Sequence, residues 1–250
     1  MSAVYDRSSA EQREWALRCD LAAVFRVCAR LGMNEQIGNH HSVMLPGAEP
    51  LFLINPRGLL FQEISASKLI VCDLDGKVVS GTGELRKVAF HIHARIHLLH
   101  PMARCVLHVH PQYLTALSMI KGGRLELAHH NNLILNDRVA YDEEQHGPVN
   151  DNDEGDRIAR LLGDKTILLM ANHGVTVVGA TVHEAFDELY VAERTCMYQL
   201  TAMNSGRALC LQPEALCARY NGPWGERVDA RLHLDAWRRI LDREEPEYAT

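Results

Sequence analysis

The chain lacks the features that mark membrane, secreted and nucleic-acid-binding proteins. Its 250 residues contain no apolar run of about 18 residues, so we expect no membrane span. Residues 1–13 are polar, which argues against a secretory signal. A net charge of −6 without a cluster of Lys and Arg argues against a nucleic-acid partner. Seven cysteines scattered without a CxxC pair indicate reduced thiols and a cytoplasmic protein.

The chain also lacks internal repeats, low-complexity segments and a clear linker. Its composition, 47% apolar and 23% charged, is ordinary for a globular protein, and its length fits one large domain. We therefore predict a single α/β domain over residues 1–250, with strands covered by helices on both sides. We expect an irregular polar loop over residues 128–150. Apolar periodicity predicts helices over residues 8–31, 85–99, 112–120, 153–162, 181–203 and 228–241.

Histidine, in contrast, is abundant, with 14 residues, most of which we expect on the surface or in the core. Residues 105–110 are typical of a buried strand that ends in two histidines, His108 and His110. Residues i and i+2 of a strand point to the same face, so both imidazoles could reach one metal ion. A second buried strand, residues 166–171, leads into His173. If the two strands lie close together, His173 could supply the third ligand that zinc usually requires; the alternative is a hydrogen-bonded histidine at a strand end.

The chain carries several separate motifs in this order: residues 38–42, 53–58, 64–69, 71–76, 106–111, 168–174 and 178–186. Together they resemble the class II aldolase/adducin family. The resemblance covers about residues 14–205, with residues 206–250 as a C-terminal helical extension. It implies a three-layer α/β/α sandwich around a mainly antiparallel sheet. It also implies a homotetramer with active sites between subunits.

The same resemblance assigns a metal site. In the metal-dependent members of the family, the histidines that match His108, His110 and His173 bind a divalent ion, usually zinc, with manganese or iron as further options. Three neutral histidines would leave the ion with its full positive charge and with open positions for substrate oxygens.

The chain departs from the sugar-phosphate aldolases of this family at their acidic catalytic residue. That residue lies four positions before a helical histidine that matches His93, and the position is Ala89 here. Glu84 is one candidate replacement, with a helix-stabilising role as its alternative. His93 or His91 is another candidate for the acid/base or for a fourth ligand, with packing beside the sheet as the alternative. Tyr141, in the polar loop, could serve the site of a neighbouring subunit or belong to a plain surface loop.

A second departure concerns the substrate. The sugar-phosphate members carry Ser-Gly where this chain has Arg57-Gly58, and their serine pair before the acidic residue is missing. Asn39 is retained and remains a substrate-binding candidate. An arginine can hold a carboxylate through two parallel hydrogen bonds, so Arg57 favours a small carboxylic acid over a sugar phosphate. The alternative for Arg57 is a solvated turn residue.

The expected function is a divalent-metal-dependent carbon–carbon lyase. It would perform retro-aldol cleavage or decarboxylation of a small hydroxy acid, keto acid or sugar-like substrate through a metal-stabilised enediolate. A non-haem iron oxygenase is one alternative, although three neutral histidines differ from the usual two-histidine, one-carboxylate iron site. A non-catalytic adducin-like protein is the other, although the adducin head domain has lost the metal ligands that persist here.

Overall fold

A computed structural model describes residues 2–220 and 229–250 of the chain, with side chains from residue 9 onward. Its centre is an eight-stranded sheet in the order β4-β3-β2-β1-β5-β8-β7-β6. All neighbouring strands are antiparallel except β6 and β7, which are parallel. The strands are β1 (His40–Met44), β2 (Phe52–Ile54), β3 (Ile70–Cys72), β4 (Val78–Ser80), β5 (Cys105–Val109), β6 (Val139–Asp142), β7 (Ile167–Met170) and β8 (Gly174–Gly179).

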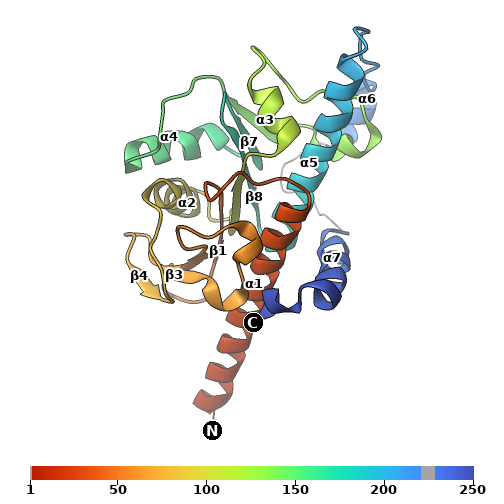
Figure 1. Cartoon of the computed structure of the whole chain (residues 1–250). Helices are drawn as coiled ribbons and strands as arrows, with labels where there is room; N and C mark the ends of the chain where they lie inside the picture. Colours follow the sequence, from red (N-terminus) through yellow and green to blue (C-terminus); the bar gives the residue numbers. More distant parts are fainter. Residues whose placement is uncertain (1, 221–228) are drawn as a thin grey trace.

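Helices cover both faces of this sheet (Figure 1). Helices α2 and α4 lie on one side, and α1, α3, α5 and α7 lie on the other. The α-helices are α1 (Ser2–Arg30), α2 (Lys87–Leu99), α3 (Gln112–Ser118), α4 (Asn152–Leu162), α5 (Val182–Met203), α6 (Glu214–Cys217) and α7 (Ala230–Glu244). The 3₁₀ turns are η1 (Phe61–Glu63), η2 (Ala66–Lys68), η3 (His130–Leu135), η4 (Ala218–Tyr220) and η5 (Pro246–Ala249).

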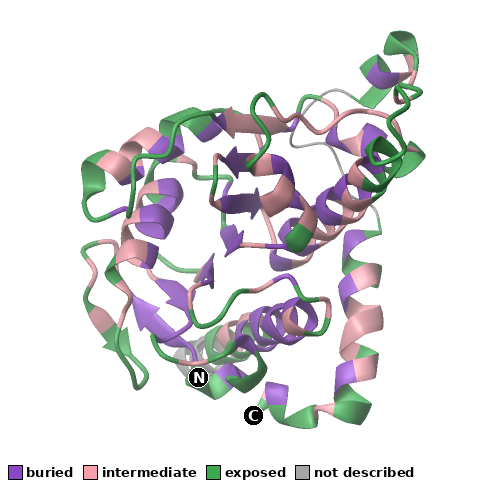
Figure 2. Ribbon diagram, turned by 45° about the horizontal axis from the view of Figure 1, so that its top comes forward, coloured by how far each residue is buried: buried purple, intermediate pink, exposed green. Residues whose placement is uncertain are grey.

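The central strands are apolar on both faces because each face packs against helices. On one face, Leu107 and Val177 join a core that includes side chains of α1, α5 and α7. On the other face, Val106 and Val178 pack with side chains of α2 and α4. Figure 2 shows the result: the inner strands are buried, and the exposed residues lie on the outer helix faces and the loops. Because side chains alternate along a strand, His108 belongs to the α2/α4 side with Val106.

The C-terminal segment packs onto the first helix. Leu234 and Leu241 of α7 and Tyr248 of η5 belong to the same buried cluster as α1. Arg26 of α1 forms an ion pair with Glu245 at 3.1 Å, which lies at the junction of α7 and η5. The predicted start of this last helix, residue 228, falls outside the described residues.

The structure confirms the α/β sandwich and its mainly antiparallel sheet. The prediction of an irregular segment over residues 128–150 was wrong, because this segment contains η3 and the edge strand β6. The polar composition of residues 128–150 gave no sign of β6, which lies at the edge of the sheet and pairs only with β7. The predicted helix start at residue 85 was also early, since α2 begins at Lys87 and Glu84 therefore precedes the helix. All seven cysteines, which lie in the described part, are free, and none of the described helices could cross a membrane.

Candidate metal centre

Two elements bring three histidines together. His108 is on β5, and His110 follows directly after its last residue. His173 lies in the tight turn between β7 and β8, where Met170 pairs with Gly174. Strand β8 lies between β5 and β7 in the sheet, so this turn returns the chain beside the end of β5. A side chain at position 174 would clash with His110, since a Cβ there would lie 2.6 Å from the His110 ring. Glycine is therefore required for the close approach.

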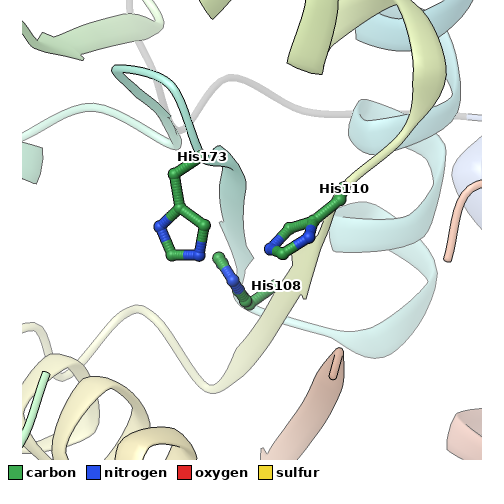
Figure 3. A group of neighbouring side chains, drawn as sticks. All are labelled: His108, His110 and His173. Atoms are coloured by element: carbon green, nitrogen blue, oxygen red, sulfur yellow. The ribbon is translucent and has the colours of Figure 1, made fainter. Parts of the chain in front are cut away.

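The three imidazoles face one another, as Figure 3 shows. One ligand-capable nitrogen from each of His108, His110 and His173 lies within 4.8 Å of the others. His108 is buried, and the other two are half-buried. Burial lowers the pKa of His108 well below its ordinary value and lowers the pKa of His173 to about 4. Both rings are therefore neutral at physiological pH, which is the form that binds a metal ion.

Hydrogen-bond partners fix which nitrogen of two ligands faces the centre. His110 Nδ1 lies 2.7 Å from the Glu35 carboxylate, which can only accept, so the proton is on Nδ1. His108 Nδ1 lies 3.1 Å from Thr176 Oγ1, whose own hydrogen is directed to the Met170 sulfur, so this Nδ1 also donates. In a neutral imidazole, either arrangement places the lone pair on Nε2.

These residues fit a divalent metal ion. His110 Nε2 is buried and has no hydrogen-bond partner among the described residues. A buried polar atom without a partner is costly, and a metal ion would satisfy it. An acceptor on the other ring nitrogen, most often a carboxylate, a backbone carbonyl or water, usually supports a metal-binding histidine. Neither Glu35 nor Thr176 was singled out from the sequence, because their proximity depends on loop and strand positions that no local pattern encodes.

A chain of buried polar side chains lies beside this trio. His40 is paired with His108 across β1 and β5, and their rings stack with centroids 4.8 Å apart. His40 Nδ1 lies 2.7 Å from His93 Nε2, and His93 Nδ1 contacts Ser42 Oγ. Ser42 Oγ lies 2.7 Å from His97 Nε2. Burial lowers the pKa values of His40 and His93 well below the ordinary value and that of His97 to about 4.

The predicted catalytic candidates Glu84 and His93 lie in different surroundings. His93 is fully buried, and both of its ring nitrogens are hydrogen-bonded. Direct contact with a substrate or a metal ion would therefore require one of these bonds to break. Glu84 is exposed, 3.7 Å from Arg57. Ala89, which occupies the usual acidic position, is packed in an apolar cluster with Phe52 and Ile70.

The substrate-binding candidate Arg57 lines a cavity of about 1130 Å³. Glu84, Arg86, Lys87 and the loop of residues 36–38 also contribute to its wall. In the chain, this loop is flanked by residues that lie at the histidine trio: Glu35 comes directly before it, and His40 follows two residues after it. The structure therefore places Arg57 and Glu84 on the wall of one cavity. Two further cationic side chains, Arg86 and Lys87, lie on the same wall.

Asn39 is buried beside this loop. Its Oδ1 accepts a hydrogen bond from the Glu35 backbone N–H at 2.6 Å, which fixes the orientation of the amide. Its Nδ2 is buried and makes no hydrogen bond to any residue that the structure describes. Asn39 thus has a free donor, as a ligand-binding amide requires.

Tyr141, a catalytic candidate that could serve a neighbouring subunit or belong to a plain surface loop, lies on β6. Its hydroxyl accepts a hydrogen bond from the Leu125 backbone N–H at 3.1 Å, and the Arg124 guanidinium lies 4.2 Å from the ring centroid. Burial raises the pKa of this hydroxyl. Tyr141 lines a separate cavity of about 450 Å³, together with Asp142 and Asn172. Its catalytic role and the tetramer stay predictions.

Comparison with known proteins agrees with this geometry. The family model for the class II aldolase and adducin N-terminal domain matches residues 19–200. The chain belongs to the class II aldolase and adducin family. Membership confirms the family that the sequence motifs resemble, and a divalent metal ion at the three histidines accords with the chemistry of class II aldolases.

Two relatives illustrate this membership, and a third protein shares the fold. A Caulobacter vibrioides protein, whose name refers to aldolase class 2 and states no substrate, is 36% identical over 247 residues, 97% of this chain and 95% of the relative. The crystal structure of an aldolase II superfamily protein from Pseudomonas syringae is 33% identical, with a TM-score of 0.89 over 95% of this chain and 96% of that one. An L-fuculose 1-phosphate aldolase from Glaciozyma antarctica shares the fold at 24% identity and a TM-score of 0.83, over 95% and 92% of the two chains.

Proposed function

We propose that this protein is a divalent-metal-dependent carbon–carbon lyase that acts on a small hydroxy or keto acid by retro-aldol cleavage or decarboxylation. The observation that carries the proposal is the trio of His108, His110 and His173, whose nitrogens lie within 4.8 Å of one another. Family membership supports lyase chemistry, and the neutral imidazoles suit zinc, manganese or iron(II), of which zinc is our first choice.

Each part of the site has a function in such a reaction. A divalent ion held by the three histidines supplies a positive charge that stabilises negative charge on substrate oxygens as the bond to carbon breaks. Arg57 binds and orients the carboxylate of the substrate from the cavity wall. The free Nδ2 of Asn39 donates a hydrogen bond to a substrate oxygen.

Arg57 supports an acid as substrate because its guanidinium has only a loose partner. It lies 3.7 Å from Glu84, and the two side chains are 64% and 82% exposed, so this ion pair contributes little. An incoming carboxylate can therefore displace Glu84 at small cost. Arg86 and Lys87 on the same cavity wall add positive charge that attracts an anion.

Metal content is the first test. The purified protein should contain about one equivalent of divalent metal by mass spectrometry, or take it up from zinc, manganese or iron(II). His108→Ala and His173→Ala should lose it, whereas His130→Ala, at an exposed histidine of η3, should retain it. A wild-type protein that stays empty with all three ions would overturn the proposal and would leave an adducin-like, non-catalytic protein.

Activity is the second test. Anaerobic assays on hydroxy and keto acids should show metal-dependent cleavage or loss of carbon dioxide. Turnover that requires oxygen would reject the lyase and indicate an iron oxygenase. Arg57→Ala should raise KM for the acid with little change in kcat, and an unchanged KM would remove Arg57 from the substrate site.

A further inference from the structure

The carboxylate of Glu35 reaches His110 from an exposed turn between α1 and β1. The Glu35 side chain is 61% exposed, and its carboxylate lies 2.7 Å from His110 Nδ1. An exposed glutamate has many rotamers and loses conformational entropy when it is held in one of them. The backbone of residues 35–39, which we call the 35–39 turn, must therefore be fixed if the carboxylate is to stay beside the His110 ring.

The inner end of the 35–39 turn is anchored by two buried amides. Asn39 Oδ1 accepts a hydrogen bond from the Glu35 backbone N–H at 2.6 Å, and the Gly38 N–H donates to the Glu35 carbonyl oxygen at 3.1 Å. Asn55, directly after β2, donates from Nδ2 to the Asn39 carbonyl oxygen at 3.3 Å. Asn39 and Asn55 are both buried, so these bonds close the turn and attach it to the sheet.

The outer part of the 35–39 turn is strained and exposed. Gln36 has a φ of +47°, in the left-handed region that residues with a side chain seldom adopt. Gln36 and Ile37 are both exposed, so packing does little to hold this conformation. A hydrogen bond from the start of α2 holds it instead, because Arg86 Nη1 donates to the Ile37 carbonyl oxygen at 3.1 Å.

The charge of Arg86 opposes metal binding. Burial, His41 and Arg86, in this order, lower the pKa of His40, whose ring stacks on that of His108, so this positive charge acts at the histidine trio. There it repels a divalent cation. Lys87 is a second cation on the same cavity wall, and it makes no hydrogen bond or ion pair with any residue that the structure describes. Charge alone therefore predicts that removal of either cation strengthens metal binding.

We infer that Arg86 is a positioning residue of the metal centre, because its hydrogen bond to Ile37 holds the strained 35–39 turn that presents Glu35 to His110. This role rests on the metal site of the proposed function and extends it to a residue that acts on His110 only through Glu35. Removal of Arg86 should therefore weaken metal binding, which is opposite in sign to the effect of its charge. Removal of Lys87 should not weaken it.

Amide hydrogen exchange, measured by NMR, tests the turn without metal or substrate. In metal-free Arg86→Ala, the N–H groups of Glu35 and Gly38 should exchange about threefold faster than in the wild type, because the bonds that protect them open more often. Lys87→Ala is the matched control, since it removes the neighbouring charge but no hydrogen bond, and it should leave both rates unchanged. Equal exchange rates in the two variants would overturn the inference.

Zinc affinity, measured by competition with a chromophoric chelator, tests what the turn does for the metal centre. Arg86→Ala should bind zinc about threefold more weakly than the wild type, which is the worth of one exposed hydrogen bond. Lys87→Ala should bind zinc as tightly as the wild type or more tightly. In a Glu35→Ala background, Arg86→Ala should cause no further loss, because the carboxylate that the turn presents is gone.

The outcomes separate this inference from the proposed function. Unchanged or tighter zinc binding by Arg86→Ala would overturn the positioning role. An equal loss with and without Glu35 would also overturn it, since Arg86 would then act on the fold in general. A wild-type protein that takes up no metal would reject the proposed function, and the exchange rates would still decide whether Arg86 holds the turn.

Discussion

Replacing Glu35 by alanine removes the carboxylate that accepts the hydrogen bond from His110 Nδ1 at 2.7 Å. Two effects should then weaken metal binding. The proton of His110 is no longer held on Nδ1, so part of the population carries it on Nε2, where it blocks the ligand atom. The ring also loses a negative neighbour that raises the basicity of Nε2.

The structure sets the size of this effect. Partners of metal-binding histidines are usually worth about 10- to 100-fold in metal affinity. The Glu35 side chain is 61% exposed, so solvent screens its charge. We therefore expect Glu35→Ala to reduce zinc affinity by about tenfold, near the lower limit of this range. Glu35→Gln keeps an acceptor oxygen, so its zinc affinity should fall only about threefold.

Competition with a chromophoric chelator at neutral pH measures these affinities directly. Glu49→Ala is the matched control, because Glu49 is an exposed loop residue away from the histidines, and it should bind zinc like the wild type. Equal zinc affinities for Glu35→Ala and Glu49→Ala would show that Glu35 does not support His110, and the reasoning would be refuted.

Three further predictions follow from buried groups. Burial lowers the pKa of His97 to about 4, so the unfolded chain binds a proton at this residue at a higher pH than the folded chain does. In urea titrations of metal-free protein, His97 should therefore lower the free energy of unfolding by about 2 kcal/mol between pH 7 and about pH 5. His97→Gln should reduce that pH dependence. Gly174→Ala should displace the His110 ring and weaken zinc binding at least tenfold, as read by chelator competition, because the added Cβ would lie 2.6 Å from the ring. Glu193→Ala should lower unfolding free energy by about 2–3 kcal/mol, because its buried carboxylate accepts the backbone N–H groups of Tyr113 and Leu114 at 2.9 Å; an unchanged urea midpoint would contradict this.

Local pattern was sufficient for most elements of the fold. Apolar periodicity predicted α5 closely, and the buried apolar runs predicted β5 and β7. Strand β6 was missed because it is half-buried at the sheet edge and follows a polar segment, so its sequence shows neither alternation nor an apolar run. Glu84 was expected at the helix start, but α2 begins three residues later without a side-chain cap that the sequence could signal.

The sequence by itself determined the family, the sandwich and the three metal-ligand candidates, because strand periodicity places His108 and His110 on one face and the family motif adds His173. Only the tertiary structure decided what surrounds them. The register of β1 against β5 places His40 on His108, and the loop after α1 places Glu35 on His110. Register and loop position depend on packing across the whole sheet, so no local pattern contains them.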